Sequence, residues 1–259
     1  WDDGRALALD SDGNVKSLLT GQFAMTLLFW GIAPEALTKG RYKLTWVGEG
    51  SFTVSGATLI SSTANEMVID VQAPNVILKL TKVGTTSYPK NISLVHADNK
   101  SKLLNDKFAA AVKKYKVFRT MDWQNTNFGT QTNPADIPSA TACRYTAGIS
   151  PEMIGAVAEE LGIDPWVCMP HRATDDYVKA FLTRLKAAMP TRSLYCEYSN
   201  ESWLSAFPGH TWVKARGMEL KLAATEYDAG MLYHAKRSSE VGVIAKSIFG
   251  AKVTTIMGV

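Results

Sequence analysis

The feature that most constrains this fold is a change of hydrophobic rhythm near residue 88 of the 259-residue chain. After that point, short apolar runs typical of buried strands alternate with longer stretches of helical periodicity. Strict alternation of strand and helix indicates βαβ units and a parallel sheet. The predicted strands lie at 91–98, 116–123, 164–171, 193–199 and 251–259, and the predicted helices at 104–115, 150–162, 174–190 and roughly 213–247.

The ends of two of these helices carry local stop and start signals. Ser150 is a favoured N-cap, Pro151 fits the first helical turn, and Gly162 is a favoured terminator. Thr174 caps the next helix, with acidic residues in its first turn, where they complement the helix dipole. These signals define both helices without any knowledge of the tertiary structure.

The first part of the chain has a period of two instead. Apolar residues alternate with polar ones in the runs 40–48, 51–62, 65–72 and 76–84, and glycine, asparagine and proline separate the runs. Several short strands with regular turns predict an antiparallel β-sandwich or β-barrel. Trp30 and Trp46 lie in this region, where we expect both in the core.

Two parallel architectures compete for the second part, the doubly wound sheet and the (β/α)8 barrel. No G-x-G-x-x-G or Walker motif is present, and long aromatic segments follow the predicted strands at 116–123 and 193–199, which favours the barrel. We therefore predict a sandwich over 1–88 and the first five βα units of a barrel over 89–259. On this interpretation about three further units would follow residue 259.

Composition excludes several classes of partner and cofactor. The net charge of +4 is too weak and too scattered to indicate nucleic-acid binding, and no apolar run is long enough to predict a membrane span. The three cysteines, Cys143, Cys168 and Cys196, have no CxxC or metal-type spacing, so we predict no metal and no cofactor. Cys168 and Cys196 lie in strand-like runs and are expected as buried apolar residues.

Polar and aromatic side chains gather where the predicted strands end. The carboxyl ends of parallel strands meet at one edge of a sheet, which is where α/β enzymes place their reactive groups. Indole rings stack on the apolar faces of sugars, and amides and carboxylates bind sugar hydroxyls. The candidate residues are Arg119, Asp122, Trp123, His171, Asn200, Glu201 and Trp203.

Glycoside hydrolysis requires two carboxyl groups on either side of the bond that is cleaved. Glu201 is our candidate for the general acid/base. Asn200 beside it is placed to bind a sugar 2-hydroxyl, and Arg119 to keep a partner carboxylate ionised. His171 is expected to orient one carboxyl group or to bind a hydroxyl.

Three motifs in this order, FRTMDWQNTN, DPWVCMPHRATDDYVKAF and LYCEYSNESW, resemble the clan A glycoside hydrolases. They are similar to a bacterial and phage-borne group labelled cellulose-binding or hydrolase-like, in which a β-sandwich precedes the barrel. The resemblance covers roughly 89–259 and implies Glu201 as the acid/base with Asn200 as its neighbour. The family's nucleophile is a glutamate ending a seventh barrel strand, beyond the segment seen here.

Structural interpretations of the same residues stay open. Asn200 also fits the cap of a following segment, and Glu197 fits either a catalytic role or an ion pair inside the barrel. Asp122 is either an active-site partner or a salt-bridge partner of Arg119 or Arg144. For His171, and for Trp123 and Trp203, a structural or core-packing role is the alternative to sugar binding.

The leading hypothesis is therefore a retaining glycoside hydrolase that acts on a polysaccharide, with its nucleophile outside this segment. The second is a non-catalytic carbohydrate-binding or adhesive protein in a larger assembly, such as a phage tail or a cell-surface complex. A third is a structural module that packs against a partner chain. The resemblance implies an extracellular or virion-associated location.

Overall fold

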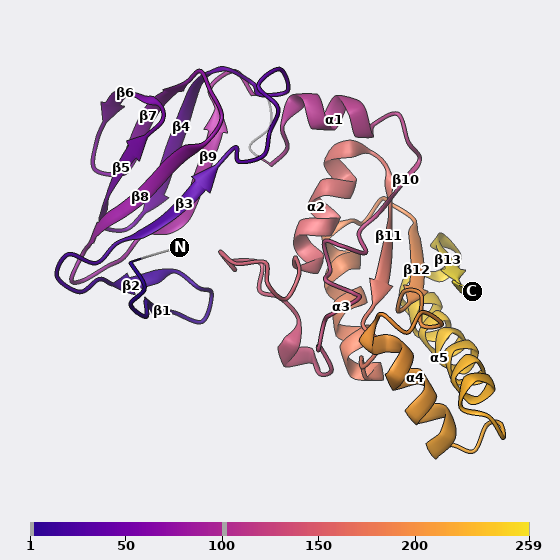
Figure 1. The fold of residues 1–259 in the computed structure, drawn as a ribbon. Coiled ribbons are helices and arrows are strands. Elements are labelled where there is room, and N and C mark those ends of the chain that lie inside the picture. The colour runs from indigo at the N-terminus through magenta and orange to yellow at the C-terminus, as the bar shows by residue number, and fades with distance from the viewer. Residues whose placement is uncertain (1–2, 100–102, 259) are drawn as a thin grey trace. The chain divides into compact units, whose positions relative to one another are not determined.

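A computed structural model of the chain describes residues 3–99 and 103–258. Contacts divide the chain into two units, Trp1–Asp106 with Thr141–Arg144, and Lys107–Ala140 with Tyr145–Val259. The strands of the first unit pair antiparallel, and those of the second pair parallel (Figure 1).

The described strands of the first unit form three antiparallel sheets in place of the predicted sandwich, so that prediction is wrong. The sheets have the orders β1-β2, β3-β8-β5 and β6-β7-β4-β9. Their strands are β1 (Ala8–Leu9), β2 (Val15–Ser17), β3 (Ala24–Leu28), β4 (Gly40–Val47), β5 (Gly50–Ser55), β6 (Thr58–Ser62), β7 (Glu66–Val71), β8 (Val76–Val83) and β9 (Lys90–His96).

The core of this unit follows the period of two that the sequence shows. Tyr42, Leu44 and Trp46 lie on the buried face of β4, and Trp46 is only 5% exposed, as predicted. Trp30 is 73% exposed, so its expected core position is wrong. The chain leaves β3 at Phe29, which has a φ of 59°, and the turn puts Trp30 outside the strand alternation.

Strand β9 overturns the rest of the predicted fold class. It was expected as the first strand of the parallel sheet, but it pairs antiparallel with β4, with Leu94 opposite Leu44. The parallel sheet formed by the described residues therefore has four strands, in the order β10-β11-β12-β13, and the predicted five-unit partial barrel is wrong. The alternating pattern specifies which segments are strands, but it does not specify their partners.

The second unit consists of the parallel sheet and its helices (Figure 1). Its strands are β10 (Val117–Arg119), β11 (Asp164–Met169), β12 (Leu194–Tyr198) and β13 (Val253–Ile256). The helices are α1 (Asp106–Val112), which begins at the boundary between the units, α2 (Pro151–Leu161), α3 (Asp175–Ala188), α4 (Pro208–Glu219) and α5 (Glu226–Phe249), and the short 3₁₀ turns are Pro134–Asp136 and Gly250–Lys252.

The capping signals are confirmed, whereas the single long helix is wrong. The Ser150 side chain accepts a hydrogen bond from the Met153 amide, and Gly162 ends α2 in the left-handed region. The helix expected near 213–247 is two helices, because the chain breaks after α4 and Thr225 caps a new helix.

One face of the parallel sheet is covered by α2, α3 and α5. Val167 and Met169 of β11 and Cys196 of β12 belong to the core formed with these helices. Because side chains alternate across a strand, Trp166, Cys168 and Glu197 point to the opposite face. The candidate site lies on that face and at the carboxyl ends of the strands.

Candidate functional site

Arg119 and Asn200 meet at the carboxyl end of the parallel sheet, although 81 positions separate them in the sequence. Arg119 ends β10, and Asn200 follows the end of β12. Arg119 Nη2 donates hydrogen bonds to Asn200 Oδ1 at 2.9 Å and to Glu197 Oε2 at 2.6 Å. One guanidinium nitrogen therefore joins a carboxylate to an amide.

Glu197 is the buried carboxylate of this network, with only 3% of the residue exposed. Its Oε2 atom also accepts hydrogen bonds from Trp166 Nε1 at 2.8 Å and from Cys168 Sγ at 3.2 Å. The guanidinium of Arg119 lies over the Trp166 ring, 4.8 Å from its centre. Of the two roles left open for Glu197, the geometry favours the ion pair within the sheet.

The thiol beside this carboxylate stays protonated. Burial is the main cause that raises the pKa of Cys168 well above its ordinary value, and the negative charge of Glu197 raises it further. Burial and then Glu197 also raise the pKa of Cys196 to about 12. Both cysteines are buried, as expected, and neither has the depressed pKa of a nucleophilic thiol.

Asn200 is held from two sides and is only 5% exposed. Besides accepting from Arg119, it donates from Nδ2 to Asn127 Oδ1 at 2.9 Å. Asn127 lies in the loop after β10, so the amide connects two strand-end loops. The alternative role of Asn200 as a helix cap is wrong, because α4 begins later, with Phe207 in the N-cap position.

The turn around Asn200 is strained. Ser199 has a φ of 61° and Glu201 a φ of 40°, a region that residues with a Cβ seldom occupy. Each such residue costs about 1 kcal/mol or more and persists where the surroundings impose it. Glu201 is partly exposed, and within residues 3–99 and 103–258 no hydrogen bond or ion pair holds its carboxylate. Its backbone oxygen accepts from the Leu204 amide.

His171 lies in a different environment from Arg119. The residue is 2% exposed, and its ring lies beside Trp212 of α4, with ring centres 6.2 Å apart. Neither ring nitrogen has a hydrogen-bond partner in the described part of the chain. Burial, followed by the charge of Arg172, lowers the pKa of His171 to about 4, so the ring is neutral at pH 7.

The other three candidates are placed individually. Asp122 is exposed, and no ion pair to Arg119 or Arg144 occurs among the described residues. Trp123 is 36% exposed and packs on Phe118, with ring centres 5.8 Å apart. Trp203 is partly buried. Gly258 lies close to both its indole and Glu197, because a Cβ on Gly258 would be 3.9 Å from the Trp203 ring and 2.5 Å from Glu197 Oε1. The indole therefore lies near that carboxylate.

Sequence reasoning assigned no role to Asn127 and Gln124, both in the loop after β10. Beyond the end of β10, the Gln124 side chain makes the hydrogen bonds to β11 that a strand backbone would otherwise make. Its Oε1 accepts from the Cys168 amide at 2.9 Å, and its Nε2 donates to the Cys168 carbonyl at 3.2 Å. This side chain satisfies backbone groups of β11 and anchors the loop. The run Gln124-Asn125-Thr126-Asn127 was the available signal, because amides so close to a strand end often replace backbone partners.

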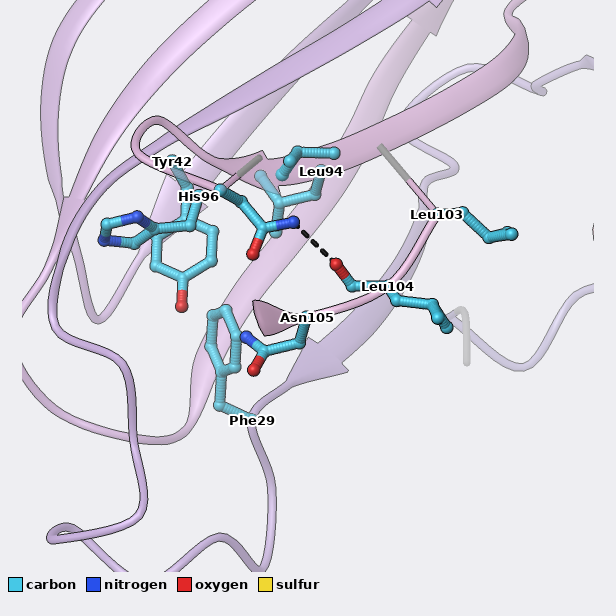
Figure 2. Close-up of a pocket in the computed structure, with 9 residues that line it drawn as sticks. Phe29, Tyr42, Leu94, His96, Leu103, Leu104 and Asn105 are labelled. Carbon is cyan, nitrogen blue, oxygen red and sulfur yellow. Dashed lines mark hydrogen bonds between the residues drawn. The ribbon is translucent and has the colours of Figure 1, made fainter. Parts of the chain in front are cut away.

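A pocket of about 400 Å³ lies in the same loop region, lined by Asn125, Phe128, Gly129, Thr130, Gln131, Asp136, Thr146 and Ala147. The first unit has a smaller pocket of about 230 Å³, whose lining includes Phe29, Tyr42, Leu94 and His96 (Figure 2). At its rim Asn99 Nδ2 donates to the Leu104 carbonyl at 2.6 Å, drawn as the dashed line in Figure 2.

The described residues contain no group of three or more His, Cys, Asp or Glu side chains placed to hold a metal ion. None of their helices combines the length and the apolar character that crossing a bilayer requires. In comparisons with known proteins, no family model, no curated protein and no solved structure matches this chain.

Proposed function

We propose that this chain carries part of the catalytic site of a retaining glycoside hydrolase acting on a polysaccharide. Glu201 is the general acid/base, and the nucleophile is supplied from outside this segment. The observation that carries the proposal is the strained turn Ser199-Asn200-Glu201, with its central amide buried and bound on both sides. Backbone strain of this kind concentrates at functional sites, where it fixes the direction of a side chain.

The network behind the turn supports an orienting role. Arg119 and Asn127 fix the Asn200 amide, and this leaves one N–H of Nδ2 for a hydroxyl of the substrate. A hydrogen bond to the sugar 2-hydroxyl strengthens in the oxocarbenium-like transition state. In this proposal Glu201 is the catalytic residue, and Arg119 and Glu197 are positioning residues that act through Asn200.

Glu201→Gln in the complete protein tests the proposal. The amide cannot donate or accept the transferred proton, so release of reducing sugar from the polysaccharide should fall by about 10²-fold or more. Glu160→Gln, an exposed glutamate of α2, is the matched control and should keep full activity. Undiminished activity in Glu201→Gln removes Glu201 from the mechanism.

The second candidate function is a non-catalytic carbohydrate-binding or adhesive protein within a phage tail or a cell-surface assembly. It is favoured by one observation: Arg119, expected to serve a reactive carboxylate, is bound to the buried Glu197 instead. Glycan binding without product sugars after long incubation supports this function, and product sugars exclude it. Both functions go with an extracellular or virion-associated location.

A further inference from the structure

The pocket after β10, defined above by its eight lining residues, contains a buried acceptor without a donor. Gln131 is 5% exposed and donates from Nε2 to the Ala147 carbonyl at 2.5 Å. Its Oε1 atom is buried and has no hydrogen-bond partner among the described residues. The chain itself therefore leaves this wall of the pocket with an unsatisfied polar atom, which is an energetic cost.

Gly129 makes the room for this acceptor. A Cβ at that position would collide with Gln131 Oε1 and would lie 2.7 Å from the Asn125 carbonyl oxygen. The loop is tied down around it, because the Gly129 amide donates to that oxygen at 2.7 Å and Asn125 Nδ2 donates to the Thr146 carbonyl at 3.2 Å. The pocket is therefore formed by anchored backbone.

The charged group of the lining is a carboxylate. Asp136 uses Oδ2 to accept from the amides of Thr132 and Asn133 at 2.9 and 2.8 Å. These backbone hydrogen bonds lower the pKa of Asp136, which keeps the carboxylate ionised at neutral pH. Asn125 Nδ2 and Gln131 Nε2 each donate one hydrogen bond, to the Thr146 and Ala147 carbonyls, and the lining includes no lysine or arginine.

An aromatic face completes the lining and links it to the strand-end site. Phe128 is 61% exposed and packs edge-on against Phe207, with ring centres 5.8 Å apart. Phe207 follows the Glu201 turn, and Asn127, next to Phe128, binds Asn200. The pocket therefore belongs to the same loop cluster as the proposed acid/base.

We propose that this pocket is a saccharide subsite that takes a neutral or amino pyranose and rejects uronic and sulfated sugars. The inference rests on the proposed function. The sugar's C–H face lies on Phe128, its hydroxyl or ammonium groups donate to the exposed Asp136 carboxylate, and an acidic sugar meets a negative charge with no lysine or arginine in the lining.

Isothermal titration calorimetry of the full chain tests this, in the Glu201→Gln background so that nothing is cleaved. The probes are cellotetraose, the glucosamine tetramer and tetragalacturonate. At least one of the first two should bind about tenfold more tightly than the third, and Phe128→Ala should weaken that binding by about tenfold. Tyr227→Ala, which removes an exposed ring from α5, is the control and should change nothing.

Gly129→Ala provides a second variant, because its Cβ would collide with Gln131 Oε1 and with the Asn125 carbonyl, so it should disturb the pocket wall and also weaken binding. Unchanged affinity in Phe128→Ala, equal binding of tetragalacturonate, or no binding of any probe overturns the subsite. If Glu201→Gln keeps its turnover while Phe128→Ala loses binding, the acid/base proposal fails and the subsite stands. If Glu201→Gln loses its turnover while Phe128→Ala keeps its binding, the subsite proposal fails and the acid/base proposal stands.

Discussion

Two buried polar groups at the ends of neighbouring strands have opposite environments. Glu197 accepts three hydrogen bonds on one oxygen atom, one of them from the charged Arg119. His171 is equally buried, but neither of its ring nitrogens has a partner in the described residues. The Glu197 carboxylate has its donors, one of them charged, whereas burial without a partner lowers the pKa of His171.

This difference indicates which of the two strand ends holds a charge in place. A satisfied network fixes side-chain positions, and at β12 it fixes the amide next to Glu201. A neutral buried histidine packed on Trp212 fills space between the sheet and α4, and it exerts little electrostatic field. The network around Asn200 is therefore the better candidate for positioning a reactive group, and His171 for supporting the α4 interface.

The largest expected effect comes from breaking the ion pair. Arg119→Met leaves the Glu197 charge buried without its cation and should lower the free energy of unfolding by about 3 kcal/mol, the lower end for buried pairs because Arg119 is partly exposed. Urea denaturation measures it. Lys236→Met removes an exposed helical pair with Glu240 and should cost about 0.5 kcal/mol or less.

A rescue variant sharpens this test. Glu197→Gln in the Arg119→Met background removes the uncompensated charge and should recover most of the lost stability, because a neutral amide is cheaper to bury than a carboxylate. If the double variant is as unstable as Arg119→Met alone, the loss comes from packing and not from charge.

A smaller effect should appear in acid. Burial puts the pKa of folded His171 at about 4, below the ordinary value of 6.5. Between these values the unfolded chain binds the proton and the folded chain does not, so stability falls as the pH falls through 6.5 towards 4. The loss between pH 7 and pH 5 should be about 2 kcal/mol.

His171→Phe isolates this contribution. The variant should lose less stability on acidification than the parent chain in urea titrations at pH 7 and pH 5. Burial also lowers the pKa of His234, so part of the acid sensitivity should survive the substitution. An identical pH dependence in parent and variant would show that His171 titrates normally and is not buried as described.

The smallest effect comes from releasing the strained turn. Ser199→Gly removes the Cβ from a residue with a φ of 61° and should stabilise the fold by about 0.5 kcal/mol. Lys221→Gly, at a φ of 53° after α4, should give a similar gain. Only Ser199→Gly should reduce activity or sugar binding, because only that turn adjoins Glu201. If both variants change activity or sugar binding equally, the strain at Ser199 has no specific role in the site.

Part of the candidate site could be predicted from the sequence. Arg119 and Asn200 were expected together because both end strands of a parallel sheet, and the sheet register brings them within hydrogen-bond distance. His171 also ends a strand, but Tyr198 and the residues of α4 enclose it on the helix-covered side. Strand ends define an edge, whereas the face on which a side chain lies depends on the turn that follows.

The sequence by itself determined the local elements. Ser150 and Gly162 bound α2 because capping bonds join residues only three or four positions apart. The tertiary structure alone decided that β9 pairs with β4, and that Arg119 binds Glu197 across 78 residues. The physical reason is range: caps and periodicity are satisfied within one segment, while strand partners and buried charges are chosen by whichever distant group offers the better burial and hydrogen bonds.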